Sequence, residues 1–462
     1  MKKSYVKKSK VIVPVFAANS SSSFTRLNDV IKILLTVFPE IYYSGNNESE
    51  KILEKIDFDP FFKMAAIKTA LNLLTRRDFS GNLEDLIYIM HFLKDIGVSG
   101  IAELPFTQKH QSTTSPFSSS SFGLELDYLV LELVPEVQES PELLAMIPKR
   151  PASYEKDMVC DFAMHREIRK GILAKAYKKF VDKISKDPQS ERAKEYEEYV
   201  NTYKENLEIN AIFSIVQSKV LNTYMDAMPD FRTWPERYQN PESEEVKILA
   251  SLHSEEIEIY KYSQFCMHEQ QLFIKELYNE LGLKREVNIA FGIDPSASGD
   301  VWALQGKAFN IEYELGTDNG QNWCIPPYIT ESEAYYELME QRIKYLAQYI
   351  DVIFLDHMCG YATQYIIKKG VPNDPGRYEI DPSNRAQKIK NVKRIIKIAL
   401  KHGLEVGGET LGDAPRQSAV EEAIRKMKKE GHPIAEMYVA PHKSLGGQYS
   451  NPQKLPEDIE LF

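Results

Sequence analysis

Two carboxylates stand at the ends of two short apolar runs. Asp356 follows Val-Ile-Phe-Leu, and Glu409 follows Leu-Glu-Val-Gly-Gly. A strand that ends on an acid presents it at the carboxyl edge of a parallel sheet, where α/β barrels carry out chemistry. Two such acids suit glycosyl transfer, because an ionised carboxylate can attack the anomeric carbon while a protonated one donates to the leaving oxygen. The alternative is that each acid caps the following helix or forms a salt bridge.

Composition narrows the classes of partner. The chain has 462 residues, 43% of them apolar, and a net charge of −10. Because it lacks long basic blocks, we expect no nucleic acid partner, and because it lacks an apolar stretch of about eighteen residues, we expect no membrane span. The basic N-terminus leads into an apolar run broken by Pro14, which makes a marginal signal peptide, so a cytoplasmic protein is expected.

Cofactor and metal signals are weak. The four cysteines, Cys160, Cys266, Cys324 and Cys359, have no CxxC spacing, which argues against a zinc knuckle or a disulfide framework. The glycine pairs at 407–408 and 446–447 lack the strand-turn-helix spacing of a phosphate loop. The sequence therefore predicts no cofactor and no metal.

Alternating apolar runs predict an α/β fold of the TIM (β/α)8 barrel type. Strands are expected at 99–106, 286–294, 351–356, 404–409 and 434–440, with helices at 332–349 and 386–401. Charged helical patterns predict a helical insertion at 155–285. We expect two parts, a βα-like extension at 1–64 and a divergent barrel at 65–462, in which only one strand and a polar tail follow Glu409.

Three motifs in this order resemble the 4-α-glucanotransferases (amylomaltases, disproportionating enzymes) of glycoside hydrolase family 77. They are Gly320-Gln-Asn-Trp-Cys-Ile-Pro-Pro-Tyr328, Asp356-His357 followed by Gly360, and Gly408-Glu-Thr-Leu-Gly412. Upstream, Ser115-Pro-Phe117 and the segment Phe291–Trp302 are also similar to that family. The similarity covers roughly residues 66–440.

The resemblance implies a role for each matching residue. Asp356 would be the nucleophile and Glu409 the general acid/base of a retaining transfer. His357 would form a hydrogen bond with the sugar bound at the nucleophile, and Trp323 would form an apolar platform under a glucose ring with Gln321 beside it. Two further substrate-binding positions would be Ser115 and Asn288.

The chain departs from the family pattern at several of these positions. Phe354 stands where the family has an arginine two residues before the nucleophile, Phe117 replaces a tyrosine, and Asn288 replaces an acid. A third carboxylate, which the family carries in a Thr-His-Asp motif, has no clear counterpart, since Pro441-His442-Lys443 places a lysine there. The strands that would follow residue 440 are expected to be missing or replaced.

These observations leave three hypotheses. The first is a transferase that passes α-1,4-glucan segments between maltooligosaccharides. The second is a relative that binds glucan but has lost turnover, which Phe354 and the missing third acid favour. The third is a barrel enzyme that acts on another substrate, because fold alone does not fix function. The sequence does not predict the oligomeric state.

Overall fold

The computed structural model describes residues 83–95, 99–110, 115–148, 162–381, 383–409, 414–432, 434 and 437–438. The predicted extension at 1–64 lies outside these residues, so the proposed division of the chain at residue 64 stays a prediction. Pro441-His442-Lys443 also lies outside them.

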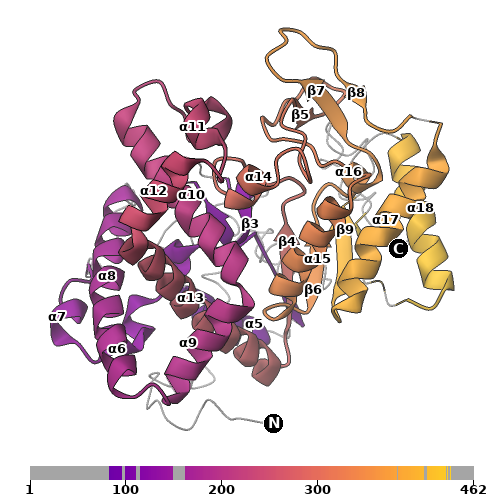
Figure 1. Ribbon diagram of the computed structural model, residues 1–462. Coiled ribbons are helices and arrows are strands. Elements are labelled where there is room, and N and C mark those ends of the chain that lie inside the picture. The colour runs from indigo at the N-terminus through magenta and orange to yellow at the C-terminus, as the bar shows by residue number, and fades with distance from the viewer. Residues whose placement is uncertain are drawn as a thin grey trace, which may run out of the picture. The chain divides into compact units, whose positions relative to one another are not determined.

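A parallel sheet forms the centre of the described fold (Figure 1). Its strands, in spatial order, are β1 (Gly100–Glu103), β4 (Lys284–Ile289), β6 (Val352–Leu355), β9 (Glu405–Glu409) and β10 (Met437–Tyr438). Every neighbouring pair is parallel, and the order of the five strands in the sheet is the same as their order along the chain. This winding is that of a TIM barrel rather than of a doubly wound sheet, and it confirms the predicted α/β fold.

Strand β6 forms where the sequence is continuously apolar, whereas its neighbour β4 reads Lys-Arg-Glu-Val-Asn-Ile. All four residues of β6 are buried, as expected for a parallel strand that is covered on both faces. Its backbone pairs with β4 on one side and β9 on the other, so its N–H and C=O groups are satisfied within the sheet. The carboxyl ends of β4, β6 and β9 consequently lie at one edge.

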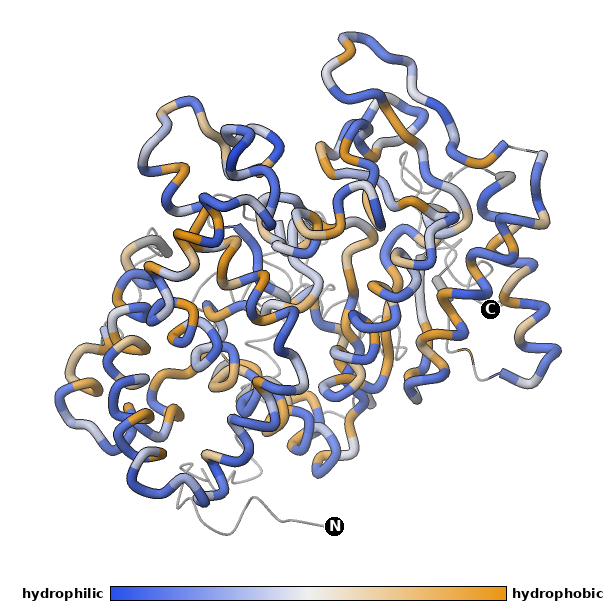
Figure 2. The backbone as a smooth tube through the Cα atoms, in the orientation of Figure 1, coloured by the Kyte–Doolittle hydropathy of each residue, from blue (hydrophilic) through white to orange (hydrophobic). Residues whose placement is uncertain are grey.

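In the central sheet, a helix precedes each of the four strands that follow β1 along the chain. These helices are α13 (Ser254–Leu281), α15 (Glu333–Ala347), α17 (Arg385–Lys401) and α18 (Ala414–Lys429). Side-chain caps begin two of them, since Ser332 accepts from the Ala334 N–H and Asn384 accepts from the Gln387 N–H. In Figure 2 hydrophobic and hydrophilic residues alternate along the helices, as expected for helices with one buried face. The packing of α17 on both α15 and α18 forms a layer over the sheet.

Helices fill the segment between residues 162 and 281. They are α8 (Phe162–Lys186), α9 (Glu191–Thr202), α10 (Lys204–Thr223), the 3-10 helix η4 (Phe231–Thr233), α11 (Glu236–Gln239), α12 (Glu244–Leu252) and α13. Arg192 of α9 donates to Glu136 at 3.0 Å and pairs with Glu269 of α13, which ties these helices together. The segment lies within the predicted helical insertion.

The remaining described elements precede or connect the strands and helices of the sheet and the helical segment. They are α5 (Leu83–Asp95), β2 (Thr107–Lys109), β3 (Ser119–Leu124), η2 (Leu126–Tyr128), η3 (Leu131–Leu133), α6 (Pro135–Gln138), α7 (Pro141–Leu144), α14 (Gly299–Ala303), β5 (Tyr313–Gly316), α16 (Met358–Ala362), β7 (Tyr365–Lys368) and β8 (Arg377–Tyr378). Strands β2 and β3 form an antiparallel hairpin, and β5, β7 and β8 form a small antiparallel sheet. Along the described ranges, no helix is long and apolar enough to cross a membrane.

The segment after Glu409 differs from the prediction. We expected one strand there, and the structure adds α18, a helix of 16 residues, before β10. Its buried apolar residues include Ala419, Val420, Ala423, Ile424 and Met427. The other positions of α18 are mostly charged or polar, so its hydrophobic signal in the sequence was weak.

Candidate active site

The two predicted carboxylates end neighbouring parallel strands. Leu355 of β6 pairs with Gly408 of β9, and the same register places Asp356 level with Glu409. The Asp356 N–H still donates to the Ile289 carbonyl of β4 at 3.2 Å, so the ladder extends as far as this residue. Neighbouring strands lie about 4.8 Å apart, close to the carboxyl separation of about 5–5.5 Å that retaining glycosyl transfer requires.

Below Asp356, the sheet is uncharged at two of the positions where the chain departs from the family pattern. Phe354 and Asn288 are Cα partners in the β4–β6 register and are 3% and 5% exposed. Paired residues in a parallel sheet share a face, and so do residues i and i+2 of one strand. Phe354 and Asp356 therefore lie on the same face. The Asn288 Oδ1 is buried and has no hydrogen-bond partner among the described residues.

His357 occupies an unusual backbone position beside Asp356. Its φ of 46° lies in the left-handed region, which histidine tolerates better than most residues, and it forms the N-cap of α16. The centroid of its ring lies 5.6 Å from that of Phe291 and 5.2 Å from that of Trp323, and both ring pairs pack edge to face. Burial, followed by the charge of Arg416, lowers the pKa of His357 to about 4. The imidazole is thus neutral at pH 7 and can both donate and accept a hydrogen bond.

The predicted Gln-Asn-Trp loop reaches the same place. The Trp323 Nε1 donates to the Gln321 Oε1 at 3.1 Å, and the Trp323 ring stands against His357. The loop is held to β5 because the Trp323 N–H donates to the Leu315 carbonyl at 2.8 Å. Gln321 is exposed and Trp323 is half-buried, so both have surface available to a ligand. The structure therefore groups three of the predicted sugar-binding residues, Gln321, Trp323 and His357.

Ser115 contacts a residue of its own loop. It is exposed, and its hydroxyl accepts from the Phe117 N–H at 3.3 Å, which is an ordinary turn contact. The segment it starts lies beside the segment after β4, since the Asp294 N–H donates to the Ser119 carbonyl at 3.2 Å. Sugar binding by Ser115 and by Asn288 stays a prediction.

Three residues at this edge were missed from the sequence. Phe291 follows β4 and packs edge to face on both His357 and Tyr361 of α16. Burial is the main cause that raises the pKa of Tyr361, and the negative charge of Asp356 is a smaller one. This phenol therefore lies near the carboxylate. Arg416 of α18 is 3% exposed. Phe291 was visible as part of a motif and Tyr361 directly follows one, whereas nothing in the local sequence of Arg416 indicated a site.

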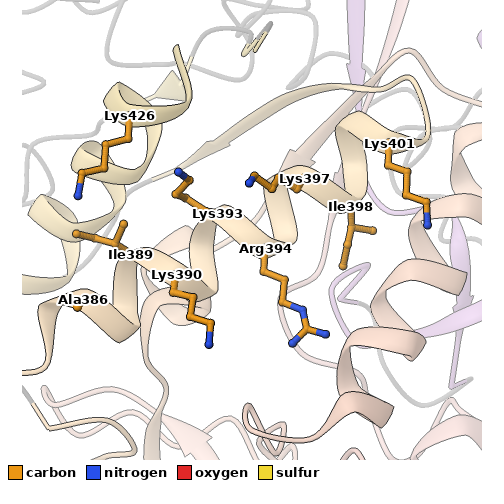
Figure 3. Close-up of a pocket in the computed structure, with 9 residues that line it drawn as sticks. All are labelled: Ala386, Ile389, Lys390, Lys393, Arg394, Lys397, Ile398, Lys401 and Lys426. Atoms are coloured by element: carbon orange, nitrogen blue, oxygen red, sulfur yellow. The ribbon is translucent and has the colours of Figure 1, made fainter. Parts of the chain in front are cut away.

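A separate groove of about 570 Å³ runs along α17 (Figure 3). Six of its nine lining residues are Lys or Arg, including Lys390, Lys397 and Lys426. Four of the six form ion pairs with glutamates, as Lys393 does with Glu430. Because a neutral sugar gains little from such a surface, this groove does not compete with the strand edge as the sugar site.

Comparison with known proteins finds a family model and curated relatives that match this chain. A family model described as 4-alpha-glucanotransferase, glycoside hydrolase family 77, matches residues 72–459. A 4-alpha-glucanotransferase from Chlamydia pneumoniae is 23% identical over 346 residues, and one from Haemophilus influenzae is 23% identical over 239 residues. The matches cover 73% and 48% of this chain, but the chain spans only 62% and 33% of these two relatives.

Solved structures show the same fold. An amylomaltase from Streptococcus agalactiae in complex with acarbose is 20% identical with a TM-score of 0.59, and the match covers 75% of this chain and 69% of that one. An amylomaltase from Corynebacterium glutamicum is 16% identical with a TM-score of 0.55, and the match covers 75% and 47%. At these identities the likeness concerns the fold alone.

Proposed function

Since the chain belongs to the 4-alpha-glucanotransferase family, glycoside hydrolase family 77, we propose that it transfers α-1,4-glucan segments between maltooligosaccharides. The observation that carries the proposal is the level placement of Asp356 and Glu409 on neighbouring strands. The group of Gln321, Trp323 and His357 at the same edge supports it, because an aromatic ring and polar side chains together suit a sugar.

The proposed reaction has two displacements. In the first, the Asp356 carboxylate bonds to the anomeric carbon, the glycosidic bond breaks, and Glu409 gives its proton to the leaving oxygen. In the second, the hydroxyl of an acceptor sugar attacks the same carbon, the Asp356 ester breaks, and the Glu409 carboxylate takes the hydroxyl proton. The neutral His357 would hold the donor sugar, and Trp323 would lie against an apolar sugar face.

Maltotriose tests this proposal directly. Purified protein incubated with maltotriose is expected to give glucose together with longer oligomers, resolved by anion-exchange chromatography. Asp356→Asn is expected to abolish the ladder, because the amide cannot form the glycosyl ester, while leaving maltotriose binding measurable by calorimetry. An unchanged ladder in Asp356→Asn would exclude this residue as the nucleophile, and glucose and maltose alone would indicate hydrolysis.

A glucan-binding function without turnover is the second candidate. Phe354 favours it, since a buried phenylalanine on the face of Asp356 supplies no charge to keep the carboxylate ionised. Calorimetric binding of maltooligosaccharides with no change in their length distribution after prolonged incubation would support this candidate over transfer.

A further inference from the structure

The loop that carries Trp323 ends in an uncommon backbone conformation. Cys324, the next residue, has a φ of 58°, in the left-handed region that costs a residue other than glycine free energy. The Asn322 Oδ1 accepts from the Cys324 N–H at 2.8 Å, and the Asn322 Nδ2 donates to Glu314 of β5 at 2.7 Å. The Cys324 side chain is exposed, so packing of its thiol does not offset the cost. The loop's own contacts thus hold the Cys324 N–H, and its carbonyl requires a partner from another element.

Arg232 of the helical segment supplies that partner. It lies in η4, 92 residues before Cys324, and its Nη2 donates to the Cys324 carbonyl at 2.7 Å. The same Nη2 lies 3.7 Å from the Glu314 Oε1. The Arg232 side chain is only 3% exposed, so this charge-assisted hydrogen bond is shielded from water and stronger than one between neutral groups. Arg232 therefore links the helical segment to both ends of the loop.

Asp230 fixes the guanidinium in this position. Its Oδ2 accepts from the Arg232 Nη2 at 2.7 Å and from the Arg232 Nε at 2.9 Å. Its Oδ1 accepts from the Arg232 N–H at 2.9 Å, which makes Asp230 the N-cap of η4. Because this carboxylate already orients the arginine fork, little side-chain entropy is lost when the fork binds the loop.

Lys369, which follows β7, is another cation near the loop. Burial, followed by the charge of Arg232, lowers the pKa of Lys369. Its described hydrogen bond runs from its backbone N–H to the Glu312 carbonyl at 3.0 Å, outside the loop. Of these two cations, Arg232 therefore has the direct contact with the loop.

We propose that Arg232 is a positioning residue that holds Trp323, from the helical segment, in place to bind sugar. The proposal rests on the proposed function, in which Trp323 lies against an apolar sugar face. Because Cys324 directly follows Trp323, fixing the Cys324 carbonyl fixes the backbone from which the indole extends. The indole centroid then lies 5.2 Å from that of His357. The helical segment thus acts in sugar binding through the loop, without touching the sugar.

Fluorine NMR of the tryptophans tests the position of Trp323 without any sugar. The chain has three tryptophans, and the other two, Trp234 and Trp302, are 2% and 0% exposed. Protein labelled with 5-fluorotryptophan should give three ¹⁹F signals, and the Trp323 signal is assigned with Trp323→Phe. In Arg232→Met the Trp323 signal is expected to shift or broaden, while the Trp302 signal serves as the buried reference.

The matched control is Arg237→Met. Arg237 is an exposed arginine in α11 of the same helical segment, and its described contacts are with Tyr224 and Tyr238. It should leave the Trp323 signal and maltotriose binding unchanged.

Maltotriose affinity, measured by calorimetry, gives a second readout. It should fall about tenfold in Arg232→Met, because a charged hydrogen bond that holds the loop is lost. Arg232→Lys should recover part of the loss, since lysine keeps the charge but not the fork. In a Trp323→Ala background, Arg232→Met should cause no further loss, because a residue that acts through Trp323 has no effect once the indole is gone.

The outcomes separate this inference from the proposed function. A Trp323 signal that is the same in wild type and in folded Arg232→Met, or in Arg232→Gln if the methionine variant does not fold, would overturn the role of Arg232. Equal losses of affinity from Arg232→Met with and without the Trp323 indole would overturn it as well. Wild type that shows the predicted change in the Trp323 signal but no oligomer ladder would overturn the proposed transfer and leave the role of Arg232 in the loop standing.

Discussion

At the scale of single residues, the site combines charged edge residues with an uncharged layer beneath them. Asp356 and Glu409 end their strands, whereas Phe354 and Asn288 one level below are buried and neutral. The family pattern would place an arginine and an acid at those two positions. Phe354 and Asn288 are Cα partners on neighbouring strands. Both charged residues of the family pattern are therefore replaced by uncharged residues at paired positions.

A double-mutant cycle tests this matched replacement. Phe354→Arg alone is expected to destabilise the protein by about 3–5 kcal/mol, because it buries a cation at a packed apolar position whose partner on β4 is the uncharged Asn288. Asn288→Asp alone should also destabilise, because it adds a buried acid close to Asp356. The double variant should recover about 1–3 kcal/mol relative to the sum of the single changes. Urea unfolding of the four proteins gives these energies, and strictly additive losses would show that the two positions do not interact.

At the scale of elements, the close approach of α16 to the segment after β4 positions His357. A Cβ placed on Gly360 would lie 2.6 Å from the Phe291 Cζ and 2.7 Å from the His357 Cδ2. Only glycine leaves room there for both rings. This explains why a glycine follows the Asp-His pair in the motif, a spacing whose cause was not visible in the sequence.

Gly360→Ala should therefore displace His357 and Phe291. We expect a loss of about 1–3 kcal/mol in unfolding free energy from overpacking, measured by urea unfolding. Maltotriose affinity should fall roughly tenfold by calorimetry, equivalent to about 1.4 kcal/mol. The control is Gly171→Ala in α8, where no atom lies within 4 Å of the added Cβ, and it should stabilise the protein by about 0.5–1 kcal/mol. Equal effects of the two substitutions would contradict this account of Gly360.

At the scale of the whole described fold, a half-buried histidine joins the helical segment to the segment that leads into the sheet. The Nδ1 of His268 in α13 lies 2.7 Å from the hydroxyl of Tyr349, between α15 and β6, and its ring stacks on Tyr199 of α9 at 4.5 Å. Burial lowers the pKa of His268 to about 4 from its ordinary value of 6.5. Below pH 6.5 the unfolded chain therefore binds a proton that the folded chain does not, so stability falls as the pH decreases from 6.5 toward 4.

The variant His268→Gln removes this proton linkage and retains hydrogen-bonding groups for Tyr349. Acidification from pH 7.5 to pH 5 should cost wild type roughly 2 kcal/mol more unfolding free energy than it costs the variant. Other titrating groups, such as Glu269, whose pKa is raised to about 7 by burial, are common to both proteins and cancel in the comparison. Urea midpoints at the two pH values provide the measurement, and parallel losses would show that His268 titrates alike in both states.

The sequence by itself determined the α/β class, the positions of four main strands and the acids that end two of them. These features are local, because a buried parallel strand is a short apolar run and a polar residue after it marks its end. The Gln-Asn-Trp motif was likewise readable, since its residues are close together in the chain. The roles of these residues remain proposals that depend on the resemblance.

Only the tertiary structure decided which residues meet. The register that places Asp356 level with Glu409, the contact of Trp323 with His357, and the burial of Arg416 all join segments far apart in the sequence. No local pattern encodes such distances, because register and close approach follow from how strands and helices pack together. Arg416 looked in sequence like one more surface charge, whereas in the structure it is only 3% exposed.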